Sequence, residues 1–113
     1  MDIFYQKLVP LAEQAEQEFD ASSQGRSVCQ LHKQGQVSKR LKYCEGRDYV
    51  ARRMLRLASQ GAAQQKLEST LAQLEHKHLS LKQSPVLSGP DWQAYADGVL
   101  SMVVEIRALL DNI

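Results

Sequence analysis

The sequence predicts an all-α fold: a compact bundle of four to five helices with a short helix-turn-helix-like segment in the middle. Two observations favour this fold class. Gln, Ala, Leu, Glu, Lys and Arg dominate the composition, and β-branched residues are few. Apolar residues recur every three or four positions, and the sequence has no alternating strand patterns joined by hairpin turns. With 113 residues, the chain is expected to form a single helical domain over residues 1–113.

The first helix is predicted over residues 2–21. The residues of its apolar face follow helical spacing: Phe4, Leu8, Leu11, Ala15 and Phe19. Pro10 lies inside this pattern and removes one backbone donor. We therefore expect either a kink at Pro10 or a helix that restarts near Val9. The small and polar residues at 20–26 then predict a loop.

A change in the apolar phase divides the next segment at Gly35. The apolar residues on its two sides would lie on nearly opposite faces of one continuous helix: Val28 and Leu31 before it, Val37, Leu41 and Cys44 after it. One straight helix cannot bury both sets against a single core. We therefore expect a short helix that starts at about residue 27 and ends near Gln34, and a second helix over residues 36–44.

The segment after residue 44 predicts a turn followed by another helix. Residues 45–47 form the turn, and Asp48 is a good N-cap for a helix over residues 48–60. The expected buried stripe of this helix contains Val50, Met54, Leu57 and Ala58. Gly61 follows as the stop. Residues 36–60 are therefore expected to fold as helix, short turn, helix.

This segment shows a local resemblance to DNA-binding proteins. Residues 36–41 resemble the first helix of a helix-turn-helix. The residues that follow are similar to the recognition helix and stop of winged-helix regulators: Val50, Arg52, Leu57 and Gly61. The turn over residues 41–49 is longer than usual, and no glycine-rich hairpin that could form a wing follows it. The resemblance implies contact with nucleic acid.

The next helix is predicted over residues 62–82. Its apolar residues alternate four and three apart: Leu67, Leu71, Leu74, His78 and Leu81. Because this seam spans only about two heptads, it favours a bundle core over a free-standing coiled coil. Residues 84–90 are then a loop, and Ser88 with Asp91 fits a capping box in which Pro90 occupies the first turn.

The last helix is the most hydrophobic and carries two apolar seams. One seam contains Trp92, Ala96, Val99, Val103, Ile106 and Leu110. The second seam contains Tyr95, Met102, Leu109 and Ile113. A helix that is apolar over more than half of its circumference is either central in its bundle or shared with a second chain. The second alternative predicts a homodimer whose interface is the second seam.

Charge segregation is the main functional signal. Residues 26–56 contain nine basic residues and two acidic ones, whereas both flanking segments are acidic. On the helix predicted over 48–60, one exposed face is expected to carry Tyr49, Arg52, Arg53 and Arg56, with Lys39 and Arg40 as further candidates for binding. Three alternatives explain this face: a solvated helix or one paired with the acidic first helix, a nucleic-acid site, or a site for an acidic protein.

Catalysis and metal binding have weaker support. Cys29, His32 and Cys44, joined by His76 or His78, could supply metal ligands, but a zinc site usually shows two tight ligand pairs, and only one is present. We therefore predict buried thiols, no metal and no cofactor. The sequence carries neither a nucleophile with an adjacent base nor a glycine-rich phosphate loop.

The predicted function is therefore non-enzymatic. We expect a small binding protein, acting as an adaptor, a chaperone-like protein or a regulator through protein–protein contacts. The alternative is a nucleic-acid-binding regulator that uses residues 36–60. Two cysteines suit a reducing cytoplasm, and no long apolar run suggests a membrane segment.

Overall fold

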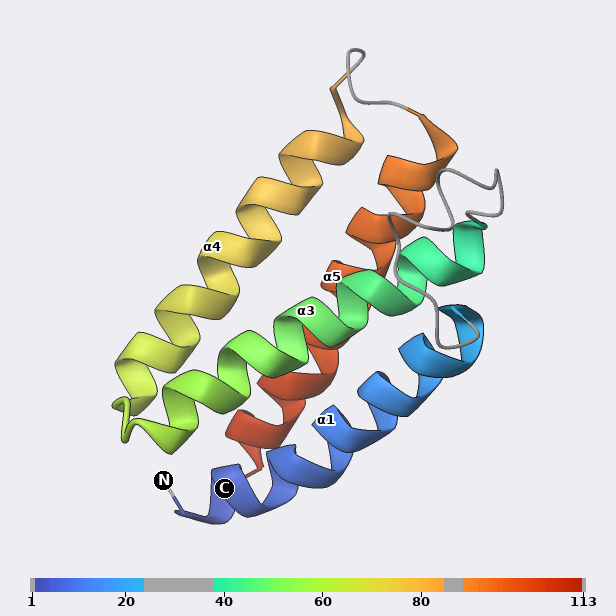
Figure 1. Cartoon of the computed structure of the whole chain (residues 1–113). Helices are drawn as coiled ribbons and strands as arrows, with labels where there is room; N and C mark the ends of the chain where they lie inside the picture. Colours follow the sequence, from blue (N-terminus) through green and yellow to red (C-terminus); the bar gives the residue numbers. More distant parts are fainter. Residues whose placement is uncertain (1, 24–37, 85–88, 113) are drawn as a thin grey trace.

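The computed structural model describes residues 2–23, 38–84 and 89–112 and confirms the all-α fold class. Within these ranges it contains four helices, arranged as Figure 1 shows. They are α1 (Asp2–Ser23), α3 (Lys39–Ser59), α4 (Gln64–Lys82) and α5 (Pro90–Asp111). None of these helices combines the length and the apolar character needed to cross a bilayer.

Helix α1 is continuous through Pro10, so the predicted restart near Val9 is wrong. Pro10 is exposed, while the opposite face is buried and contains Phe4, Leu8, Ala12 and Ala15. The helix also extends two residues beyond the predicted end, into the predicted loop. The hydroxyls of Ser22 and Ser23 donate to the carbonyls of Phe19 and Asp20 and so support its last turn.

Helix α3 runs without a break through the segment that was predicted to turn. The predicted turn at 45–47 and the helix-turn-helix-like arrangement are therefore wrong. The N-cap is Ser38, whose hydroxyl accepts a hydrogen bond from the backbone N–H of Leu41 at 3.0 Å. Asp48 is not a cap but lies buried inside the helix. The predicted stop is correct, because Gly61 has a φ of 77°. The helix predicted over 27–34 lies outside the described residues.

The glycine that suggested a turn instead forms a close helix crossing. A Cβ added to Gly46 of α3 would overlap the carbonyl oxygen of Tyr95 in α5. A Cβ added to Gly98 of α5 would overlap the carbonyl oxygen of Tyr43 in α3. Two glycines therefore face each other's helices and let the two backbones touch. This crossing fixes the position of Tyr95 beside α3.

The predicted seam of α4 is confirmed at Leu67, Leu71, Leu74 and His78, which are buried, whereas its last member, Leu81, is half-buried. Helix α5 begins with Pro90, as predicted, but its N-cap is Gly89 and no side chain bonds to the cap. The predicted capping box depends on Ser88, which lies outside the described residues.

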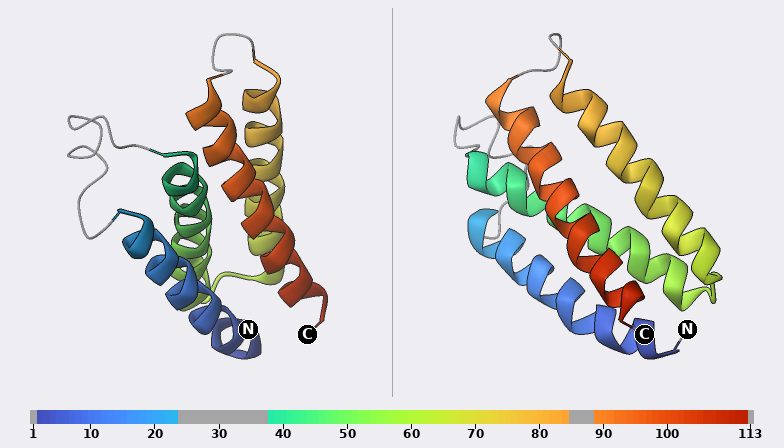
Figure 2. Two further views of the ribbon diagram at one scale, coloured as in Figure 1. Left: turned by 90° about the vertical axis from the view of Figure 1, so that its right-hand side faces the viewer. Right: turned by 180° about the vertical axis from the view of Figure 1, so that it is seen from behind.

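Helix α5 lies centrally and packs against α1, α3 and α4, as the views in Figure 2 show. Five residues of its predicted core seam are buried: Ala96, Val99, Val103, Ile106 and Leu110. Trp92 was predicted in this seam but is 53% exposed. In the second seam Met102 is fully covered by the chain's own helices, and Tyr95 and Leu109 are partly buried against the same core. Ile113 lies outside the described residues, and the homodimer stays a prediction.

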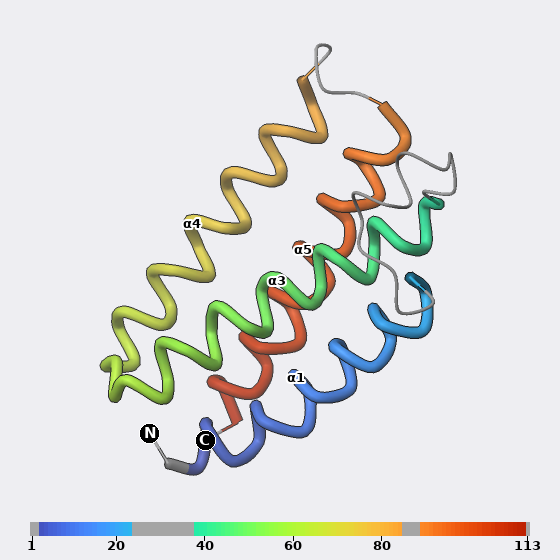
Figure 3. Tube along the Cα trace, viewed as in Figure 1, coloured from blue at the N-terminus to red at the C-terminus, as the bar shows by residue number. Residues whose placement is uncertain are grey.

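Helices α3 and α4 touch each other little. They join at the turn around Gly61 and diverge from it, while α5 passes across the space between them (Figure 3). On its other side α3 packs extensively against α1. One side of α3 is therefore covered by a helix, and the side toward α4 is open.

Candidate functional site

Several residues of the basic segment stabilise the fold. Arg47 donates to Ser101 at 2.9 Å and pairs with Glu105 at 2.7 Å, both on α5, and its Nε lies 3.9 Å from Glu18 on α1. Burial alone would lower the pKa of Arg47, but the hydrogen bond and charge of Glu105 outweigh it and the pKa is raised. Lys42 pairs with Glu45 at 3.3 Å. Arg47 therefore connects three helices, Lys42 pairs within α3, and neither charge is available to a partner.

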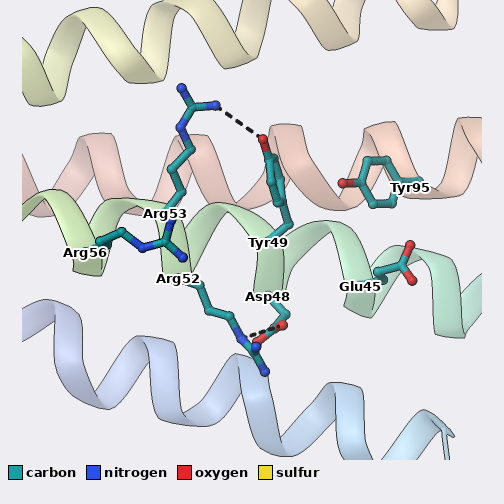
Figure 4. A pocket seen from close by; sticks show the side chains of 7 residues that line it. All are labelled: Glu45, Asp48, Tyr49, Arg52, Arg53, Arg56 and Tyr95. Carbon is teal, nitrogen blue, oxygen red and sulfur yellow. Dashed lines mark hydrogen bonds and ion pairs between the residues drawn. The ribbon is translucent and has the colours of Figure 1, made fainter. Parts of the chain in front are cut away.

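Arg52 is bound to a buried carboxylate. Its Nε lies 2.9 Å from Asp48 Oδ2, and both side chains point toward α1 in Figure 4. Burial raises the pKa of Asp48, and the charges of Glu16 and Asp20 on α1 act in the same direction, while Arg52 opposes them. The other oxygen, Asp48 Oδ1, is buried and has no hydrogen-bond partner among the described residues. Arg52 therefore compensates a costly internal charge.

Tyr49, Arg53 and Arg56 form the open part of the predicted face. Arg53 Nη1 donates to the Tyr49 hydroxyl at 3.2 Å, and both side chains point toward α4 (Figure 4). Arg56 is exposed and makes no ion pair within the described ranges. These residues border a surface hollow of about 600 Å³ that is completed by Glu45, Asp48, Arg52 and Tyr95. The structure thus confirms one exposed helix face but divides its arginines between two directions.

A second hollow, of about 330 Å³, continues from the first toward α4. The two hollows share Glu45, Tyr49 and Tyr95. The second hollow is further lined by Lys77, His78, Leu81 and Trp92. Together the two hollows form a groove between α3 and α4 that has Tyr95 at its centre, and we call it the α3–α4 groove.

An aromatic cluster forms the floor of the α3–α4 groove. The Tyr95 ring lies 6.4 Å from Tyr49, 5.9 Å from His78 and 6.2 Å from Trp92, measured between ring centroids. Lys42 Nζ lies 5.9 Å from the centre of the Trp92 ring. These separations are typical of attractive aromatic and cation–π contacts. The floor is therefore held in place by mutual ring packing.

Two polar groups lie in this aromatic floor. His78 Nδ1 is 2.8 Å from the Leu74 carbonyl, so Nδ1 carries the proton and the neutral ring leaves Nε2 as an acceptor. Burial lowers the pKa of His78 and favours this neutral form, against the opposing effect of the Leu74 hydrogen bond. Burial also raises the pKa of Tyr95 to about 12, with Glu45 adding to the shift. Both groups stay uncharged near neutral pH.

The other predicted site residues do not join this groove. Lys39 and Arg40 are exposed in the first turn of α3, and Arg40 borders a separate hollow that also contains Arg47. Of the predicted interface residues, Tyr95 lies in the groove, whereas Met102 lies in the core.

Metal binding finds no geometric support in the ranges that the structure describes, because no three His, Cys, Asp or Glu side chains gather there. Cys44 is a free, buried thiol. Cys29 and His32 lie outside those ranges.

Sequence reasoning missed the α4 wall and the α5 floor of the groove. It placed Trp92 in the core, His78 on a seam and Tyr95 at an interface. The pair Gly46 and Gly98 was the available signal, because two glycines in neighbouring helices permit a close crossing. No protein-family model, curated protein or solved structure matches the chain.

Proposed function

We propose that this chain is a non-enzymatic binding protein that holds an acidic segment of a partner protein in the α3–α4 groove. The observation that carries the proposal is a surplus of positive charge beside exposed aromatic rings. Arg52 is matched by Asp48, and Glu45 is matched by Lys42. Arg53, Arg56 and Lys77 then remain without an acidic partner among the described residues. Such a surface favours an anionic occupant.

The exposed rings favour a protein over nucleic acid. Single-stranded nucleic acid needs open ring faces on which bases stack. In the groove, the other three rings pack around Tyr95 and Lys42 lies over Trp92, so the rings do not form a row of stacking platforms for successive bases. The continuous α3 removes the helix-turn-helix-like turn on which the nucleic-acid alternative depended.

The same residues suit binding better than catalysis. His78 is held by the Leu74 carbonyl, and burial keeps it neutral. The residues that line the two hollows include no serine, threonine or cysteine nucleophile. We propose a cytoplasmic location, because a reducing compartment suits the free thiol of Cys44.

The proposal is tested by two charge-reversal variants of equal charge change on one helix. The groove variant carries Arg53→Glu and Arg56→Glu, and the control variant carries Lys39→Glu and Arg40→Glu. All four side chains are exposed, so both variants should fold. A protein captured from nuclease-treated extract is identified, purified and titrated against each variant. We expect the groove variant to lose binding and the control variant to keep it.

Two outcomes would contradict the proposal. The first is equal binding of the identified partner by both variants. The second is tight binding of a single-stranded oligonucleotide that the groove variant abolishes and that weakens with salt at a log-log slope of about 0.7 per phosphate contact. The second outcome would assign the groove to nucleic acid.

A further inference from the structure

We propose that the acidic segment is an amphipathic helix that inserts one tryptophan above Tyr95 and places carboxylates one and two turns away against Arg53 and Arg56. This inference rests on the proposed function and specifies the chemistry of the partner. It follows from the shape of the α3–α4 groove, from the order of its side chains along α3, and from the polar groups in its floor.

The shape of the groove fits a helix. Its walls are α3 and α4, which diverge from the turn at Gly61, and α5 crosses beneath them (Figure 1). Along α3 the groove extends from Glu45 to Arg56, a rise of about 16 Å at 1.5 Å per residue. A partner helix of about 11 residues spans this length. A helix laid between two helices buries one face and leaves the other in water, as in other helix-in-groove complexes.

The order of side chains along α3 fixes where the partner's groups must lie. Tyr49 borders both hollows, whereas Arg53 and Arg56 border only the larger one. They follow Tyr49 by four and seven residues and therefore lie one and two turns farther along the same side of the helix. A partner helix aligned with α3 needs the same spacing between its apolar anchor and its carboxylates. The sequence expected in the partner is an aromatic residue with acids four and seven positions away.

The smaller hollow specifies the anchor. Its volume of about 330 Å³ suits one large side chain. Four of its seven lining residues are aromatic or aliphatic, namely Tyr49, Tyr95, Trp92 and Leu81, and they lie beside Glu45, Lys77 and His78. The polar group at the bottom of this hollow is a hydrogen-bond acceptor, because His78 Nε2 has a lone pair and no hydrogen-bond partner among the described residues. Tryptophan combines a large ring with an N–H donor and no acceptor, which matches this site better than phenylalanine.

The experiment uses labelled 16-residue helical peptides and the full chain. Each peptide carries one Trp and two Glu in an Ala- and Gln-rich background. Because the groove does not fix the direction of the partner, one peptide has Glu four and seven residues after Trp, and another has them before it. Binding is measured by fluorescence anisotropy. We expect one of the two orders to bind, and replacement of its Trp by Ala to weaken binding at least about tenfold.

Register and site are tested with matched controls. Moving both Glu to two and five residues from Trp, on the opposite helix face, should also weaken binding about tenfold. In the protein, Arg53→Ala and Arg56→Ala should weaken binding of the Glu peptide but leave binding of its Gln counterpart unchanged. Arg40→Ala should change the binding of neither peptide. Trp92→Ala tests the smaller hollow without disturbing the core, because Trp92 is 53% exposed.

Three results would overturn this inference. They are failure of both peptide orders to bind, equal affinity when Trp is replaced by Ala, and equal affinity when the Glu residues are moved. Each would leave the acidic-partner proposal standing if the identified partner still required Arg53 and Arg56. Loss of that requirement would instead remove the proposed function itself.

Discussion

The close crossing of α3 and α5 predicts that alanine in place of either glycine destabilises the fold. In Gly98→Ala the new Cβ would lie 2.9 Å from the Tyr43 carbonyl carbon and closer still to its oxygen, where ordinary contacts are 3.4–4 Å. Because the oxygen is the nearer atom, the helices must separate by about 1 Å or more. Overpacking of this kind costs about 1–3 kcal/mol, and better helix propensity returns about 1 kcal/mol.

Because the atom in the way belongs to a backbone and cannot rotate aside, the upper end of this range applies. We expect Gly98→Ala and Gly46→Ala each to lower the free energy of unfolding by about 2 kcal/mol or more. Urea denaturation followed by far-ultraviolet circular dichroism measures this change. Gly89→Ala is the control, because a Cβ there meets nothing within 4 Å, and its effect should stay below about 1 kcal/mol. If Gly98→Ala had wild-type stability, the crossing and the placement of Tyr95 would be wrong.

Three further predictions concern buried groups. Leu74→Ala should lower the free energy of unfolding by about 2–5 kcal/mol because Leu74 is 3% exposed in the core, and a loss below about 0.5 kcal/mol in urea would show that it is not core. Asp48→Asn should raise the free energy of unfolding at pH 7 but not at pH 3. The pKa of Asp48 in the folded chain is raised above 3.8. The contribution of Asp48 to stability is therefore favourable below that value and is lost as the pH rises through the folded pKa. Equal effects at both pH values would contradict a buried, ionised Asp48. Because the pKa of His78 is lowered in the folded chain, the unfolded chain binds this proton more tightly. The free energy of unfolding should therefore fall as the pH drops below 6.5. His78→Gln should reduce this dependence of stability on pH relative to wild type.

The sequence was sufficient where burial follows a single helical period. Leu67, Leu71, Leu74 and His78 repeat at three and four residues and are all buried in α4. The end of α3 at Gly61 was equally predictable, because a glycine after an apolar stripe commonly adopts a positive φ.

The sequence was ambiguous where the deciding contact is distant along the chain. Gly46 reads locally as a turn, and only the backbone of α5, some fifty residues away, shows that its missing side chain is a helix contact. The two directions taken by the arginine side chains likewise depend on contacts that the local sequence does not show. Arg52 and Arg53 are neighbours in sequence, but Asp48 holds one toward α1 while Tyr49 accepts from the other on the α4 side.

The aromatic floor could not be predicted because each ring was assigned from its own helix. Trp92 fits the apolar seam of α5 by spacing, yet it lies in the first turn of that helix and is 53% exposed. Tyr95 has Tyr49 as a neighbour because Gly46 and Gly98 bring α3 against α5. A site assembled from three helices depends on crossing geometry that periodicity does not specify.

The central claim is that the α3–α4 groove is the binding surface, and amide chemical-shift mapping tests it most directly. The isotope-labelled full chain is titrated with its identified partner or with the Trp- and Glu-containing peptide. The claim predicts that the largest shifts gather at the groove, in Tyr49, Arg53, Arg56, His78 and Tyr95, while Lys39 and Arg40 change little. Largest shifts at Lys39 and Arg40, or on the outer face of α1, with the groove unchanged, would contradict it.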